Sequence, residues 1–169
     1  MTFLQSSQFN NLAINFESIT VLSNSTTDFA ISSGTVFQLG NSDQLHGSDS
    51  YSVSSGVITL PGSYYYLLKF VPAATSPVED SSKTASFSYQ FYDTVSSSYI
   101  GRRGWLIWQE SPKLNGGDEY AIALVDASSS SKAIDCRVTT VNGSNIVGDP
   151  TGSQSSFVGL SRLEIFKWS

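Results

Sequence analysis

The sequence predicts an all-β protein, and three observations support this fold class. Charged residues make up 14% of the 169-residue chain and 33 serines take their place, whereas helix surfaces usually carry Glu, Lys and Arg. Aromatic residues reach 12%, with eight Tyr and ten Phe, and they favour strands. Apolar residues alternate within short segments, and turn residues recur about every 8–12 positions. This spacing is typical of a β-sandwich or jelly roll of about 8–10 antiparallel strands.

The first half of the chain contains several short extended segments. The run at 64–71 directly follows a Pro61-Gly62 turn, and it is apolar on both of its faces. A strand with one solvated face should alternate, so we expect a second subunit to cover the other face. The other segments expected to be extended are 12–16, 19–21, 35–39, 51–53 and 57–60.

The second half alternates more clearly. Phe87, Tyr89 and Phe91 fall on one face of a strand over 85–93, which we expect to form a hairpin with 98–108. The segments 119–126 and 133–141 are expected to form another pair, and 159–168 the last strand. The long polar stretches at 40–50 and 142–156 are expected to be loops. Composition does not change abruptly along the chain, which predicts one domain over 1–169.

No constellation of residues indicates catalysis, a cofactor or a metal. His46 is the only histidine and lies in a polar segment, so we interpret it as a solvated loop residue. One His and one Cys cannot form a zinc site, and Cys136 alternates with apolar neighbours as a buried residue does. Asp43 and Asp49 could bind a hard cation, but a solvated loop is the better interpretation. We therefore expect no enzyme.

Net charge and hydropathy indicate which classes of partner the protein is not expected to bind. The net charge of -5 argues against binding to nucleic acid, and no apolar run approaches the roughly 18 residues of a membrane span. The sequence starts without a signal-peptide pattern. Arg102 and Arg103 are adjacent on a strand, so either one of them points inward or towards a partner, or both are ordinary strand-end charges.

The tryptophans leave two interpretations open. Trp105 and Trp108 could face a ligand, because sugar rings stack on aromatic side chains. Alternatively these residues, together with Trp168 and the Tyr64–Tyr66 run, pack in the core or between subunits.

Four segments, taken in order, resemble one family. Residues 51–70 resemble the B–C hairpin of C1q/TNF-like jelly rolls, with a strand, a Pro-Gly turn and a Tyr-rich strand. Residues 85–104 resemble the D–E hairpin of the subset found in bacteriophage virion proteins, and 118–140 the next two strands. Residues 161–168 resemble the closing strand. The resemblance covers about 50–169, while residues 1–50 are expected to hold additional strands or an attachment segment.

The resemblance implies a ten-stranded jelly roll that assembles as a homotrimer and has no shared catalytic residues. The sequence shows neither the collagen-like stalk nor the coiled coil that is common in fibre proteins. We expect the trimer axis to be lined from one face of the aromatic strands. The interface candidates are Tyr64, Tyr66, Phe91, Tyr120 and Phe166.

The expected function is that of a structural protein of a tailed-phage virion, assembled in the host cytoplasm. The first interpretation is a trimeric capsid decoration or cement protein that contacts the major capsid protein or another virion protein. The alternative is the tip domain of a tail fibre or appendage, which would bind a receptor or a host surface glycan through Trp105, Trp108 and the two polar loops. A third interpretation, a C1q-like secreted ligand, lacks the expected signal peptide.

Overall fold

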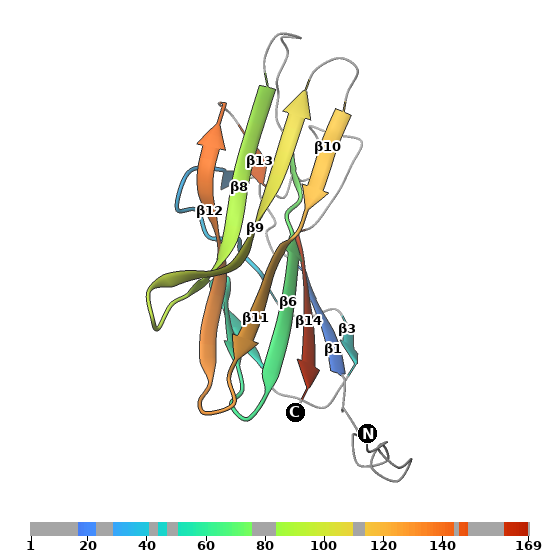
Figure 1. Ribbon diagram of the computed structural model, residues 1–169. Coiled ribbons are helices and arrows are strands. Elements are labelled where there is room, and N and C mark those ends of the chain that lie inside the picture. The colour runs from blue at the N-terminus through green and yellow to red at the C-terminus, as the bar shows by residue number, and fades with distance from the viewer. Residues whose placement is uncertain are drawn as a thin grey trace, which may run out of the picture.

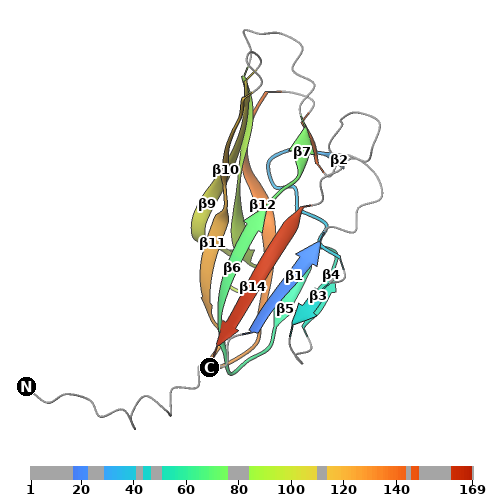
Figure 2. The ribbon, with the colours of Figure 1, turned by 90° about the vertical axis from the view of Figure 1, so that its right-hand side faces the viewer.

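The computed structural model describes residues 17–22, 29–40, 44–46, 51–75, 84–109, 114–143, 146–148 and 161–168. Within these ranges every regular element is a strand, and no helix occurs. Strands of an 11-stranded antiparallel sheet curl into two layers that face each other (Figures 1 and 2). The predicted all-β, jelly-roll class is confirmed.

The first layer, which we call sheet I, has the strand order β3-β1-β14-β6-β11. The last strand, β14, pairs with β1 on one side and with β6 on the other, so it is an inner strand of this layer. Burial alternates strictly along β6 and β14, which places every second residue in the core. The strands of sheet I are β1 (Glu17–Leu22), β3 (Gln44–His46), β6 (Tyr65–Val71), β11 (Ala121–Asp126) and β14 (Arg162–Trp168).

The second layer, sheet II, has the order β9-β8-β12-β5-β4, and β10 also pairs with β9. The expected hairpin between the segments 85–93 and 98–108 is confirmed as β8–β9. The strands of sheet II are β4 (Ser52–Ser54), β5 (Val57–Leu60), β8 (Thr84–Asp93), β9 (Ser98–Gln109), β10 (Leu114–Glu119) and β12 (Lys132–Asn142). A small separate sheet contains β2 (Phe29–Ala30), β13 (Val147–Gly148) and β7 (Ala74–Thr75).

Two expected pairings are wrong, and both errors have the same physical reason. The segments 119–126 and 133–141 do not pair, because β11 pairs with β6 whereas β12 pairs with β5 and β8. Likewise β5 and β6 form no hairpin across Pro61-Gly62, since they lie in different sheets. A short turn can close a hairpin or carry the chain across a sandwich, and the turn residues look alike in both cases. These crossings give the jelly-roll connectivity.

Strand β9 joins the two sheets through an irregularity. Residues 101–103 stand opposite Gln90, and Arg102 pairs with Ile122 of β11. Gly101 has a φ of 71°, and a Cβ there would collide with the carbonyl oxygen of Ile122. A Cβ on Gly104 would lie 2.5 Å from the ring of Tyr89. The two glycines therefore permit the close approach by which β9 passes from β8 to β11.

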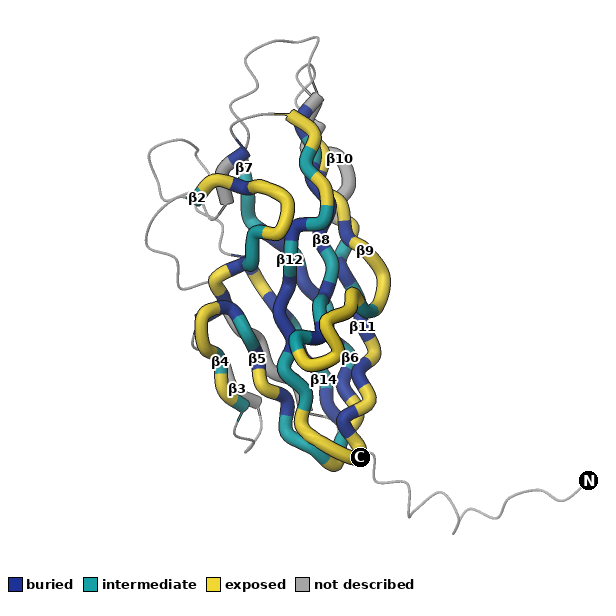
Figure 3. Tube along the Cα trace, turned by 90° about the vertical axis from the view of Figure 1, so that its left-hand side faces the viewer, coloured by how far each residue is buried: buried dark blue, intermediate teal, exposed yellow. Residues whose placement is uncertain are grey.

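The core is filled from both sheets and from the segment 31–39. The expected strand 35–39 forms no regular strand but isolated bridges, one of them between Val36 and Arg137, and it delivers Phe37 into the centre of the core. The Phe37 amide donates to the carbonyl of Cys136 at 3.1 Å, and the Phe37 ring lies 5.0 Å from that of Phe70. Phe87, Tyr89 and Phe91 are each 0% exposed, so they share one face of β8, as their alternation predicted. Figure 3 shows buried stretches of the chain, in dark blue, along β12 in the middle of the molecule.

The two expected loops are only partly described. Gln44–His46 forms β3 and pairs with β1, so the prediction of a continuous loop over 40–50 is wrong at these residues. In the segment 142–156 the described residues include β13. The expected strand at 12–16 and the cation candidates Asp43 and Asp49 lie outside the described residues.

Candidate interaction surfaces

Large apolar side chains lie side by side on the outer face of sheet I, the face that points away from the core. Leu124 of β11, Leu67 of β6 and Phe166 of β14 are paired in one row across three adjacent strands. Leu124 is 72% exposed, and Leu67 and Phe166 are half-buried. A solvated antiparallel sheet face normally carries polar side chains here.

The next row continues the same surface. The rings of Tyr65 and Trp168 stack with their centroids 6.3 Å apart and an angle of 19° between their planes, and Tyr65 is 42% exposed. We call these five residues the apolar outer face: Tyr65, Leu67, Leu124, Phe166 and Trp168.

Charged residues border this surface on one side. Glu164 of β14 accepts ion pairs from Lys69, at 3.4 Å, and from Arg162, at 3.1 Å. The Lys69 ammonium also lies 3.8 Å above the ring of Tyr120. An apolar centre with a polar rim is the composition of a protein–protein interface.

The predicted interface residues differ in burial. Tyr66 and Phe91 are 2% and 0% exposed within one chain, so their prediction as interface residues is wrong. Tyr64 packs against the core, with the Lys167 ammonium 4.1 Å from its ring centroid. Tyr120 and Phe166 are half-buried on the outer side of sheet I, and their role in an interface stays a prediction.

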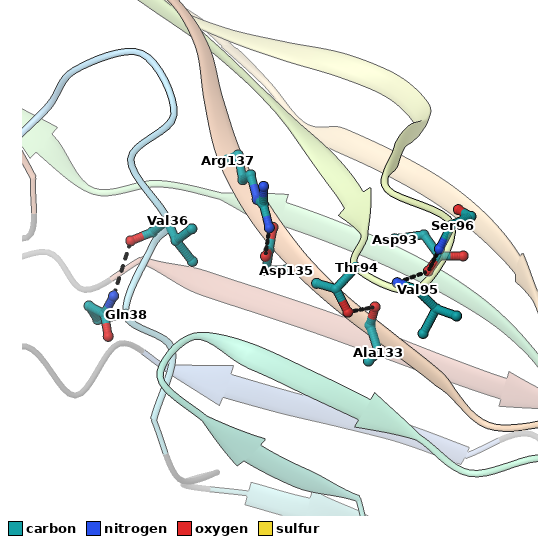
Figure 4. A network of polar contacts seen from close by, with 9 residues as sticks. All are labelled: Val36, Gln38, Asp93, Thr94, Val95, Ser96, Ala133, Asp135 and Arg137. Atoms are coloured by element: carbon teal, nitrogen blue, oxygen red, sulfur yellow. Dashed lines mark hydrogen bonds and ion pairs between the residues drawn. The ribbon is translucent and has the colours of Figure 1, made fainter.

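Sheet II carries a buried ion pair on its outer side (Figure 4). The Nε and Nη2 atoms of Arg137 donate to the two carboxylate oxygens of Asp135, each at 2.7 Å. The Asp135 side chain is 1% exposed and that of Arg137 is 27% exposed. The hydrogen bonds to Asp135 raise the pKa of Arg137, despite its partial desolvation. This bidentate geometry fixes the plane of the guanidinium.

Aromatic rings extend this cluster to the strand edge. The Arg137 guanidinium lies 3.6 Å from the ring centroid of Tyr92, and the Tyr92 ring meets that of Tyr99 edge-on at 5.1 Å. Tyr99 is 46% exposed. Asp135, Tyr92 and Tyr99 occupy one paired row, so the cluster crosses three strands.

The turn between β8 and β9 is held by a single carboxylate. Oδ1 of Asp93 accepts hydrogen bonds from the amides of Val95, at 2.9 Å, and Ser96, at 3.2 Å (Figure 4). Burial acts to raise the pKa of Asp93, but these hydrogen bonds outweigh it and the pKa lies below its ordinary value. Thr94 adds a hydrogen bond to Ala133 of β12. Val95 lies at the tip of this turn and is 73% exposed.

The other residues that the sequence analysis singled out are Cys136, the two adjacent arginines and His46. Cys136 is buried, as predicted, and burial raises the pKa of its thiol well above the ordinary value. Arg102 and Arg103 are both exposed, so the interpretation that one points inward is wrong. Arg102 forms an exposed ion pair with Glu119 at 3.1 Å. The backbone of His46 pairs with Ser18, and its side chain lies outside the described part.

Of the two tryptophans predicted to face a ligand, the structure describes the side chain of one. Trp105 is 37% exposed on β9, while the side chain of Trp108 is outside the described part. The sequence points to Trp105, to Trp168 and, through the doubly apolar run 64–71, to the segment that holds Leu67. It does not point to Leu124 or to the Asp135–Arg137 pair. The signal for Leu124 is its place on the face of β11 opposite to the buried Ala123 and Val125.

The described residues contain no group of three or more His, Cys, Asp or Glu side chains that could hold a metal ion. Over the same residues, no helix has the length and apolar character that a membrane span requires. No protein-family model and no curated protein matches this sequence.

Proposed function

We propose that this chain is a structural protein of a tailed-phage virion, which assembles into a homotrimer and decorates or cements the capsid. It acts by binding and by mechanical reinforcement, without chemistry and without a cofactor. The proposal rests on two independent supports, which are the ordered resemblance of four sequence segments and the composition of one surface.

The apolar outer face is the observation that carries the proposal. Its central row joins Leu124, Leu67 and Phe166, and the stacked Tyr65 and Trp168 lie directly beside them. Large contiguous apolar patches on a soluble chain usually mark interfaces. Obligate interfaces bury about 2,000–5,000 Å² and are more apolar than other surfaces, so a second copy is the natural occupant.

A threefold assembly fits the proposed location. Closed symmetric oligomers satisfy all copies of an interface at once. One trimer can bridge three neighbouring capsomers at a quasi-threefold point of an icosahedral lattice. The ion pairs of Lys69 and Arg162 with Glu164 would then border the subunit contact.

Copy number in purified particles tests this function. We expect many copies per particle, located on the head by cryo-electron microscopy, and loss of head stability when the gene is deleted. A few copies confined to the tail or its fibres would contradict capsid decoration and would favour a receptor-binding tip.

A further inference from the structure

The end of β12 carries a chemically labile dipeptide. Asn142 is exposed and is the last residue of β12, and Gly143 directly follows it. Glycine has no Cβ that would shield its backbone nitrogen, so this nitrogen can approach the side chain of a preceding asparagine closely. We propose that Asn142 is a site of spontaneous deamidation in the folded protein. This modification goes beyond the proposed structural function and does not depend on it.

The reaction passes through a cyclic imide. The backbone nitrogen of Gly143 attacks Cγ of Asn142, the bond from Cγ to the side-chain nitrogen breaks, and the amide proton of Gly143 leaves with that nitrogen as ammonia. Water then adds across one of the two ring C–N bonds. Opening at Cγ gives an aspartyl residue, and opening at the backbone carbonyl gives an isoaspartyl residue. Nothing is oxidised or reduced, and water is the only co-reactant.

The backbone at this strand end has the freedom that ring closure needs. Asn142 pairs with Ser86, and the described pairing of β12 with β8 ends there. Gly143 is exposed and has a φ of 106°, in the region that favours glycine. Ring closure requires rotation about ψ of Asn142, which turns the peptide bond to Gly143. Because this bond lies beyond the last pair, the rotation leaves the ladder intact, and opening at the ends of strands costs little.

A second Asn-Gly dipeptide, Asn115-Gly116, lies in a different backbone setting. Both of its residues pair with β9, Asn115 with Trp108 and Gly116 with Ile107. The same rotation at Asn115 would move Gly116 out of this register, so the pairing of β10 with β9 must open before the ring can form. The fold therefore distinguishes two dipeptides that are identical in the sequence, and only the one at the end of β12 is free to react without strand opening.

The product changes the surface at the end of β12. Each deamidation adds one carboxylate, and therefore one negative charge, to a chain whose net charge is -5. The isoaspartyl form also lengthens the main chain by one carbon atom, and this insertion falls after the last described pair of β12 with β8. Hydrolysis of the imide is not reversed in water. The acidic form should therefore accumulate with the age of the folded protein.

Site-resolved peptide mapping by mass spectrometry tests the proposal. The intact folded chain and the chain in guanidinium chloride are incubated at neutral pH, and the aspartyl and isoaspartyl products are followed at both dipeptides. In the denatured chain we expect similar rates at Asn142 and Asn115. In the folded chain Asn142 should stay within about threefold of that rate, whereas Asn115 should react at least about tenfold more slowly, because its pairing must open first.

Two substitutions support the assignment. Asn142→Gln should remove most of the acidic form of the folded chain, since glutamine needs a larger ring that closes much more slowly. Asn115→Gln is the matched control and should leave the rate of acidification of the folded chain unchanged. Isoelectric focusing measures both variants. The comparison of the two sites within the wild type needs no variant, so it decides the question even where a substitution perturbs the fold.

Three results would overturn the proposal. If Asn142 stays unmodified in the folded chain while the denatured chain reacts, the strand end protects this site. If Asn115 reacts as fast as Asn142 in the folded chain, strand pairing does not select between the two dipeptides. If the acidic form appears at an undiminished rate in Asn142→Gln, the modification lies elsewhere in the chain.

Discussion

At the scale of single residues, the Asp135–Arg137 pair is the most consequential polar contact. Asp135 is 1% exposed, and both of its oxygens accept from Arg137. Removing the guanidinium leaves a buried carboxylate without its counter-charge, which costs much more than the pair itself contributes.

We therefore expect Arg137→Ala to lower the free energy of unfolding by at least about 2 kcal/mol. The double variant Asp135→Asn with Arg137→Ala should recover part of this loss. Urea denaturation measures both. Arg102→Ala is the control, because the exposed pair with Glu119 should contribute less than about 1 kcal/mol. Equal losses for Arg102→Ala and Arg137→Ala would contradict the role of burial.

Asp93 gives a pH prediction. Its pKa in the folded chain lies below the ordinary value of 3.8, so the unfolded chain takes up its proton first as the pH falls. The stabilisation by Asp93 is therefore complete above the ordinary value and is lost as the pH falls through the folded-state pKa. Asp93→Asn keeps an acceptor for the amides of Val95 and Ser96 but no longer titrates.

The measurement is the melting temperature between about pH 6 and pH 2. Wild type should lose stability more steeply than Asp93→Asn at the acid end. Identical pH profiles for the two proteins would show that the carboxylate is not coupled to folding.

Residue-level burial was predictable only in part. Alternation placed Phe87, Tyr89 and Phe91 together correctly, and it placed Cys136 in the core. It did not tell which face of 64–71 is the inner one, because both faces are apolar. A shift of one residue exchanges the faces of a strand. The sequence therefore predicts Tyr66 as an interface residue, whereas in the structure Tyr65 and Leu67 lie on the outer face and Tyr66 is buried.

At the scale of elements, the passage of β9 between the two sheets determines how the sandwich closes. Gly101 has a φ of 71°, and a Cβ there would meet the carbonyl of Ile122 and lie 2.6 Å from the Cβ of Ala123. Backbone atoms cannot give way as the end of a flexible side chain can. The position therefore requires glycine for both conformation and space.

Gly101→Ala should destabilise the chain by about 2–4 kcal/mol, which is the sum of left-handed strain and overpacking. Gly34→Ala is the matched control, because Gly34 has a φ of 86° but nothing within 4 Å of its Cβ position. It should cost only about 1–2 kcal/mol. Chemical denaturation of both variants gives the comparison, and a loss at Gly101 no larger than that at Gly34 would argue against the close approach.

The existence of most strands was predictable, but their partners were less so. The β8–β9 hairpin followed from two adjacent alternating segments, and it is confirmed. The partners of β11 and β12 did not follow, because local turn chemistry does not distinguish a hairpin from a crossing between sheets. The segment 35–39 has the pattern of a strand, but it forms isolated bridges and inserts the side chains of Phe37 and Leu39 into the core.

At the scale of the whole molecule, the two outer faces differ in composition. Sheet I presents contiguous apolar side chains with a charged border, whereas sheet II presents aromatic side chains together with the Asp135–Arg137 pair. The sequence indicated the first surface through the doubly apolar run at 64–71. It did not indicate the row across β11, β6 and β14, because that row depends on strand register.

The proposed assembly depends on the apolar outer face, and Leu124 is its most exposed side chain. Since Leu124 is 72% exposed in the single chain, Leu124→Asp should leave the fold intact. In an assembled trimer the same change places a charge in an apolar contact, where it is costly. Circular dichroism checks that the variant keeps its strands.

The molar mass from light scattering at micromolar concentration tests the central claim most directly. We predict three times the 18.2 kDa of one chain for the wild type, and a single chain mass for folded Leu124→Asp. A wild-type mass of one chain, or a trimer unaffected by Leu124→Asp, would contradict the claim that this face joins the subunits.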